Sequence, residues 1–98
     1  MRRSEVIRLL SEHRAELEVF GVESLACFGS VARDEGRADS DVDLLVRFTE
    51  PPGFSRFMDL KFFLEDLLHS PVDLVTHSAL KARLRPQVER EAVYVRGL

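Results

Sequence analysis

The sequence predicts one domain that combines α-helices with β-strands. Segments with apolar residues at helical spacing alternate along the chain with short apolar runs that end near glycine or proline. The 98 residues can bury one hydrophobic core but not two, so we expect a single domain over residues 1–98. Hydrophobic residues make up 45% and charged residues 32%, an ordinary globular balance.

Two longer segments have the pattern of helices. The first is expected from Ser4, which can cap the helix N-terminus, to Phe20, with Gly21 as the stop. The second, Phe54–Leu68, has too many apolar residues for one narrow stripe, so the excess either forms a satellite core cluster or a docking surface for another protein. Shorter helices are expected over residues 31–35 and 78–84, and from Pro86 toward Ala92.

Four runs have the pattern of strands, namely residues 22–28, 41–48, 72–75 and a small edge strand over 93–95. The second run is the most continuously apolar, with Val42, Leu44, Leu45 and Val46. Such a run is typical of a central strand that is covered on both faces.

Charge, cysteine content and hydrophobic runs limit the functions and locations that the sequence allows. A formal net charge of −3 gives no general attraction to nucleic acid. Cys27, the single cysteine, lies in an apolar run and is expected to be a small buried hydrophobe that forms no internal disulfide. Neither a secretory signal nor a membrane-spanning segment is recognisable, so we expect a cytoplasmic protein without membrane contact.

Gly29 and Ser30 come directly after the first predicted strand and before a predicted short helix. A glycine at this turn lets a phosphate approach the backbone, and free N–H groups at the helix N-terminus together with the Ser30 hydroxyl would bind it. Such pairs also occur in ordinary turns, so the dipeptide alone is a weak signal.

Two carboxylates, Asp41 and Asp43, follow ten residues later on the second strand. Residues two apart in a strand point to the same face, so these side chains can converge. Two bare carboxylates would repel each other, so the arrangement makes physical sense if divalent cations lie between them. Mg²⁺ suits such a site, because it prefers oxygen ligands and shares its remaining positions with substrate phosphates. The alternative is a polar loop, Asp39-Ser40-Asp41, that leads into a strand.

Asp73 is the third expected member of this acidic group. It interrupts the apolar strand Val72–Val75, where a lone buried acid would be costly without a partner. If this strand lies beside the second one, Asp73 can reach the same cations, and a two-metal site would serve an in-line displacement. Asp73 would then act on the attacking hydroxyl, whereas Asp41 and Asp43 would hold both ions. Alternatively, Asp73 caps a turn after Pro71.

The combined motif resembles the signature of the DNA polymerase β-type nucleotidyltransferases. It consists of Gly29-Ser30, a ten-residue spacer that contains Arg33 and Ser40, and then Asp41-Val42-Asp43. The small size of the chain and the sequence GSVAR…SDVDLLV are similar to those of the minimal nucleotidyltransferases in particular. This resemblance implies an α/β (α+β) fold with a short mixed sheet flanked by helices.

The resemblance also implies a mechanism and a partner. ATP would be the nucleotide donor, two Mg²⁺ ions would be held by Asp41, Asp43 and Asp73, and Gly29 and Ser30 would bind the β- and γ-phosphates. Arg33 and Ser40 would assist in nucleotide binding, although a salt bridge from Arg33 to Asp34 or Glu35 is an equal alternative. Minimal nucleotidyltransferases often act as antitoxins that transfer AMP to a tyrosine of a HEPN (or HEPT) toxin.

Two other functions are alternatives to AMP transfer onto a partner protein. The chain could be an antitoxin that neutralises its partner by binding alone, or a nucleotidyltransferase for a small molecule or RNA end with an acceptor site from another subunit. For partner docking, the candidates are the Phe54–Leu68 helix, with Phe57 and Phe63, and the basic C-terminal tail. Tyr94 is expected at a half-buried strand position rather than as a self-modification site, and His69 and His77 lack partners at metal-ligand spacing.

Overall fold

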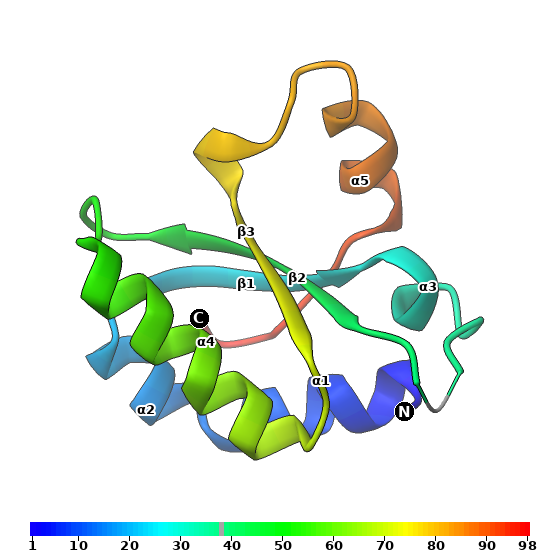
Figure 1. Cartoon of the computed structure of the whole chain (residues 1–98), viewed down its shortest axis with the longest axis horizontal. Helices are drawn as coiled ribbons and strands as arrows, with labels where there is room; N and C mark the ends of the chain where they lie inside the picture. Colours follow the sequence, from blue (N-terminus) through cyan, green and yellow to red (C-terminus); the bar gives the residue numbers. More distant parts are fainter. Residues whose placement is uncertain (38) are drawn as a thin grey trace.

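The computed structural model describes residues 1–37 and 39–98 and has a four-stranded sheet with helices on both faces. The strands are β1 (Val22–Phe28), β2 (Val42–Phe48), β3 (Val72–Thr76) and β4 (Val93–Tyr94), in the order β3-β2-β1-β4. β2 pairs with β3 in parallel, whereas β1 is antiparallel to both β2 and β4. The mixed sheet that the resemblance implies is therefore confirmed, with β2 in the interior and β4 at an edge (Figure 1).

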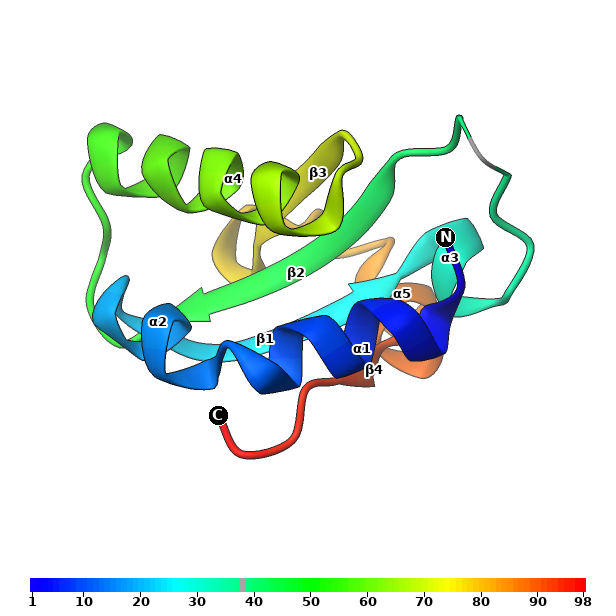
Figure 2. The ribbon, with the colours of Figure 1, turned by 90° about the horizontal axis from the view of Figure 1, so that it is seen from below.

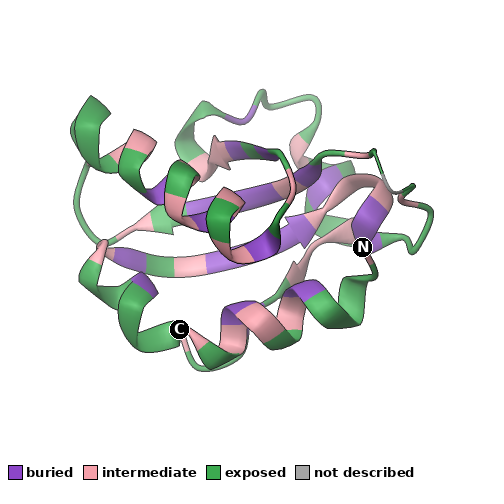
Figure 3. Ribbon diagram, turned by 60° about the horizontal axis from the view of Figure 1, so that its bottom comes forward, coloured by how far each residue is buried: buried purple, intermediate pink, exposed green. Residues whose placement is uncertain are grey.

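Three helices cover one face of the sheet, namely α1 (Arg3–Glu12), α2 (Arg14–Val19) and α4 (Phe54–Leu68). They enclose the main core, in which Leu10, Leu17, Leu64 and Leu68 have no exposed surface. The short helix α5 (Arg85–Glu91) lies on the other side of the sheet, as Figure 2 shows, and follows the 3₁₀ turn η1 (His77–Ala79). Most of the buried residues lie on the strands and the inward turns of the helices, and Leu80 and Val95 are buried outside these elements (Figure 3). None of the helices in the described part of the chain is long and apolar enough to cross a membrane.

The N-terminal segment differs from the prediction in two ways. The expected helix from Ser4 to Phe20 is broken at His13, and Ser4 does not cap it, because the N-cap position is Arg2. At the break, the His13 N–H bonds the Leu10 carbonyl at 3.2 Å and the ring nitrogen Nδ1 lies 2.8 Å from the Leu9 carbonyl oxygen. The ring thus pairs with a carbonyl that a continuous helix would join to the His13 N–H. Gly21, at φ +85°, ends the segment as predicted.

The segment after β3 also differs. Residues 78–84 do not form the expected helix; η1 covers His77–Ala79, and a turn precedes α5. The short helix expected at 31–35 is instead α3 (Gly29–Ala32), which begins at the glycine. By contrast, the predicted bounds of β1 and α4 are confirmed residue for residue.

Helix α4 distributes its aromatic residues between the core and the surface. Phe57 and Phe63 are half-buried against the main core, and Phe63 packs on Phe20 with ring centroids 5.2 Å apart. The exposed aromatic side chains are instead Phe54 (80%) and Phe62 (52%). Phe57 and Phe63 therefore contribute to packing, and the docking role expected for the Phe54–Leu68 helix stays a prediction.

Candidate functional site

The acidic residues lie on the thinly covered face of the sheet. Along β2, Val42, Leu44 and Val46 belong to the main core, so the alternate residues Asp43 and Leu45 face the opposite side. There a second, smaller cluster is formed by Ala26, Leu45, Leu80 and Val88. Asp43 lies beyond the end of this cluster, near the start of β2.

The parallel register of β2 and β3 places Asp43 directly beside Asp73. The pKa of Asp43 is raised from 3.8 to about 6, chiefly because burial disfavours the charged form, and then because of the nearby negative charges of Asp73 and Asp41. A hydrogen bond with Asp73 raises it further, while the positive charge of Arg33 lowers it. The expectation that the third strand brings Asp73 to Asp43 is therefore confirmed, but Asp73 is exposed rather than buried, because β3 is an edge strand.

Asp41 lies just before β2 and is exposed, so its charge reaches Asp43 from outside the strand. Within residues 1–37 and 39–98, no group of three or more His, Cys, Asp or Glu side chains is arranged to hold a metal ion. The geometry is thus a carboxylate pair with a third acid at its margin. Oxygen ligands of this kind suit Mg²⁺, and a divalent cation would relieve the repulsion that raises the pKa of Asp43, so the residues fit such an ion.

Gly29 stands directly against the Asp43 carboxylate. Phe28, the last residue of β1, pairs with Asp43 across the sheet, and the chain then turns at Gly29 with φ +72°. A Cβ at position 29 would collide with the Asp43 carboxylate, lying only 3.0 Å from its Cγ. Glycine is therefore required for two reasons, the left-handed backbone and the close approach of the acid.

The two serines of the motif have different surroundings. Ser30 is half-buried in the first turn of α3, and its carbonyl accepts a hydrogen bond of 2.8 Å from the Glu35 N–H. The Ser40 hydroxyl accepts a bond of 2.8 Å from the Arg37 N–H. Ser40 therefore fixes the loop before β2, a local role that the nucleotide-binding prediction did not include.

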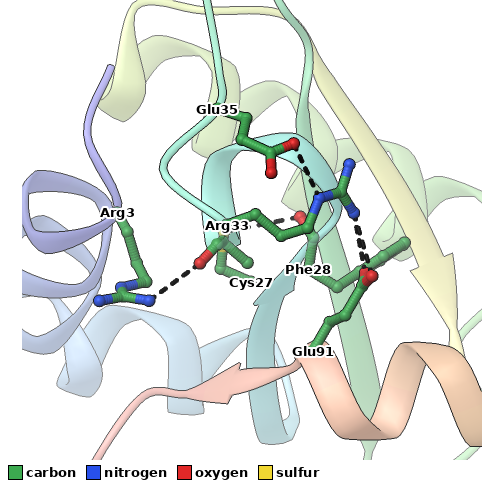
Figure 4. Close-up of polar contacts among 7 residues, drawn as sticks. Arg3, Cys27, Phe28, Arg33, Glu35 and Glu91 are labelled. Atoms are coloured by element: carbon green, nitrogen blue, oxygen red, sulfur yellow. Dashed lines mark hydrogen bonds and ion pairs between the residues drawn. The ribbon is translucent and has the colours of Figure 1, made fainter.

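Arg33 is engaged by two carboxylates, as Figure 4 shows. Its Nε lies 3.2 Å from Glu35 Oε2, and its Nη1 lies 3.1 Å from both carboxylate oxygens of Glu91 on α5. The bond to Glu35, foremost, and the charge of Glu91 raise the pKa of Arg33 above its usual value. The predicted alternative of a salt bridge to Glu35 is confirmed. Asp34 instead pairs with Arg3, at 3.6 Å between the side chains and 3.1 Å from the Arg3 backbone nitrogen.

Glu91 and Arg3 were not found by sequence reasoning. Their partners are distant in sequence, 58 residues away for Glu91–Arg33 and 31 for Arg3–Asp34, and no local spacing marks them. Only the packing of α5 and of the α1 N-terminus beside α3 brings them into contact.

Of two surface hollows, one lies beside the end of α3 and the other at the ends of β2 and β3 that are far from Asp43 and Asp73. One, of about 440 Å³, is lined by Met1, Arg2, Ser4, Asp34 and Gly36 beside the end of α3. The other, of about 280 Å³, lies at the carboxyl ends of β2 and β3 and includes Arg47, Thr76 and His77. Neither is lined by Asp43, Asp73 or Ser30. Of the acid pair, Asp73 is exposed and Asp43 is half-buried.

Cys27 lies beneath the site and is fully buried, as predicted. Its pKa is raised to about 11, first by burial and then by the negative charge of Asp43. The thiol therefore stays protonated and unreactive at neutral pH.

Comparison with known proteins agrees with this geometry. The model of the family described as "Nucleotidyltransferase domain" matches residues 7–95. Protein adenylyltransferase MntA of Thermococcus cleftensis is 47% identical over 92 residues, covering 93% of each chain. A provisionally assigned protein adenylyltransferase of Methanocaldococcus jannaschii is 40% identical over 94 residues, covering 94% of this chain and 96% of that protein.

Solved structures show the same fold. One provisionally assigned as a minimal nucleotidyltransferase superposes with a TM-score of 0.81 at 42% identity, covering 95% of each chain. A complex of tri-AMPylated Shewanella oneidensis HEPN toxin with MNT antitoxin gives a TM-score of 0.67 at 21% identity, covering 94% of this chain and 73% of that one. The chain belongs to the nucleotidyltransferase domain family. Within that family its likeness is to the minimal, MntA-like members.

Proposed function

We propose that this nucleotidyltransferase is an antitoxin that transfers AMP from ATP to a tyrosine hydroxyl of a HEPN-type (HEPT-type) partner protein. The observation that carries the proposal is the carboxylate pair Asp43–Asp73 against Gly29, in a chain 47% identical to a protein adenylyltransferase. The partner is inferred from the solved complex of a HEPN toxin with an MNT antitoxin, which has a similar fold.

In the proposed reaction, the acceptor oxygen forms a bond to the α-phosphorus of ATP, and the bond from that phosphorus to the bridging oxygen breaks. Pyrophosphate leaves with the electron pair of the broken bond. Asp73, which is exposed beside Asp43, accepts the proton of the attacking hydroxyl. The Gly29–Ser30 turn binds the β- and γ-phosphates through backbone N–H groups.

Asp41, Asp43 and Asp73 are the residues that would hold Mg²⁺. When bound, the ion would neutralise phosphate charge and polarise the reacting oxygens. The protein's own contribution is to place the carboxylates at the start of two adjacent strands, next to a turn in which only glycine fits. We propose magnesium dependence on these grounds, and transfer that persists in excess chelator would contradict it.

The decisive experiment supplies labelled ATP, Mg²⁺ and the HEPN-type protein encoded nearest to this chain. We expect label on the partner, on a tyrosine identified by mass spectrometry, and loss of the partner's toxicity. Neutralisation that survives Asp41→Ala combined with Asp43→Ala would favour an antitoxin that acts by binding. Label that appears only on RNA or a small molecule would favour a nucleotidyltransferase that acts on that substrate with an acceptor site from another subunit.

For contact with the partner, we propose the outer face of α4 around the exposed Phe54 and Phe62. The occupant would be the HEPN-type protein itself. The variant Phe54→Ser with Phe62→Ser should bind the partner at least tenfold more weakly while keeping the wild-type melting temperature. Leu84→Ser, at an exposed apolar residue (41%) on the opposite side of the sheet, is the control and should bind normally. Wild-type affinity in the double variant would exclude this surface.

A further inference from the structure

Helix α3, which begins with the Gly29–Ser30 turn of the proposed phosphate site, depends on its neighbours for its position. It has only four residues, Gly29–Ala32, and a single turn of this length is not stable by itself. Two contacts hold its C-terminal end from opposite sides. Arg3 of α1 donates from Nη1 to the Ala32 carbonyl at 3.0 Å, and Arg33, the residue after the helix, pairs with Glu91 of α5.

The contacts of Arg33 leave one part of its guanidinium open. Nε bonds Glu35 and Nη1 bonds both oxygens of Glu91, whereas Nη2 has no protein partner among the described residues. Figure 4 shows Nη1 directed at Glu91, with the remaining terminal nitrogen pointing away. The positive charge is close enough to the acid pair to lower the pKa of Asp43.

Of the two anchors, Glu91 is the more firmly held. Its side chain is 21% exposed and that of Glu35 is 65% exposed. Glu91 belongs to the last turn of α5, which is fixed through the buried Val88 and the partly buried Ala92 in the cluster under the acidic face. Glu35 lies in the loop after α3 and is close to Arg33 in sequence. An arginine side chain has many rotamers, so a fixed carboxylate reduces the entropy lost when it binds a ligand.

We propose that Glu91 is a positioning residue for nucleotide binding: it holds Arg33 through Nη1 so that Nη2 is directed to a phosphate of the bound nucleotide. The inference rests on the proposed function, since it takes a nucleoside triphosphate as the ligand. Glu91 itself does not touch the nucleotide and acts only through Arg33.

The test measures the dissociation constant of a non-hydrolysable ATP analogue, α,β-methylene-ATP with Mg²⁺, by calorimetry on the full chain. Glu91→Gln keeps the side-chain length and removes the charge, and we expect about tenfold weaker binding, equivalent to one charge-assisted hydrogen bond. Glu91→Asp, which keeps the charge but shortens the side chain, should weaken binding in the same direction. Glu89→Gln is the matched control, because Glu89 lies on the same helix and pairs with His77 at 3.5 Å, and it should bind normally.

Dependence on Arg33 is tested in a double-mutant cycle. In the Arg33→Ala background, Glu91→Gln should change the dissociation constant by less than twofold. In transfer assays with saturating partner, Glu91→Gln should raise the KM for ATP and leave kcat within about twofold. A purely structural role would lower the melting temperature without this separation.

Unchanged binding by both Glu91→Gln and Glu91→Asp would overturn the inference. Tighter binding by both variants would overturn it as well, because Glu91 would then compete with the phosphate for Arg33. Additive losses in the double-mutant cycle would overturn it too. These failures differ from failure of the proposed function, in which the wild-type chain itself binds no nucleotide or transfers no AMP. A wild-type chain that binds no nucleotide would overturn both.

Discussion

The two faces of the sheet are built on different physical terms. The face under α1, α2 and α4 carries a continuous core of fully buried Leu and Val side chains. The opposite face carries a cluster of only four buried residues, Ala26, Leu45, Leu80 and Val88, and beside it the carboxylates of Asp43 and Asp73. Burial thus stabilises the first face, while the second tolerates charge repulsion that the nearby Arg33 relieves only in part.

Stability and activity depend on different faces of the same strand. Because Asp43 and Leu45 share one face of β2 and Leu44 shares the other with Val42, a single strand serves both purposes by alternation. Substitutions on the two faces should therefore differ in kind, with losses of activity on one and of stability on the other.

The largest expected effect is that of Asp43→Asn on catalysis. The substitution keeps the shape of the side chain and removes its charge, so AMP transfer to the partner should fall by about 10³-fold or more. The fold should persist, because the raised pKa of Asp43 means that its charge opposes folding at neutral pH. Transfer assays together with thermal melts check both parts. Transfer within tenfold of wild type would remove Asp43 from the catalytic role.

The second prediction concerns the two cores. Leu64→Ala, in the main core with no exposed surface, should lower the free energy of unfolding by about 4 kcal/mol. Leu80→Ala, at 7% exposure in the smaller cluster, should cost about 2 kcal/mol, because fewer neighbours surround the deleted atoms. Urea denaturation of both variants checks the difference. Equal losses would show that the second face is packed as tightly as the first.

The third prediction is that Gly29→Ala destabilises the fold by about 2 kcal/mol and also impairs transfer. The added Cβ meets the Asp43 carboxylate, and alanine at φ +72° is strained. Gly53→Ala is the matched control, since Gly53 has φ −73° and nothing within 4 Å of a Cβ. Because Gly53 is the N-cap residue of α4, the change should cost roughly 0.5 kcal/mol and leave transfer unchanged. Comparable denaturation midpoints for the two variants would contradict the close approach of Gly29 to Asp43.

These two faces also differ in how well the sequence predicts them. Local periodicity was sufficient for β1 and α4, because alternating or helically spaced apolar residues are buried against one large core. It failed at His13, where a side chain replaces a backbone donor, and at 78–84, where the chain covers only the small cluster. The Asp43–Asp73 pair was predictable from two strand patterns, but the exposure of Asp73 was not, because strand order at the sheet edge is a long-range property.

The smallest expected effect is the pH dependence of stability in the metal-free chain. The folded-state pKa of Asp43, about 6, lies above its ordinary value of 3.8, so the folded form binds the proton more readily than the unfolded form. The contribution of Asp43 to stability is therefore fully present below pH 3.8 and is lost as the pH rises through 6. Because the carboxyl is partly solvated, we expect a change of only about 1 kcal/mol between pH 4.5 and pH 7.

Urea denaturation in chelator from pH 4.5 to 7.5 measures this change, and the comparison with Asp43→Asn isolates it. The variant cannot take up the proton, so its stability should vary less across the range and should exceed that of the wild type at pH 7. Parallel pH profiles for the two proteins would mean that the folded state does not raise the pKa of Asp43, either by burial or by the charges of Asp73 and Asp41. The acidic face would then lack the unfavourable partly buried charge that distinguishes it from the main core.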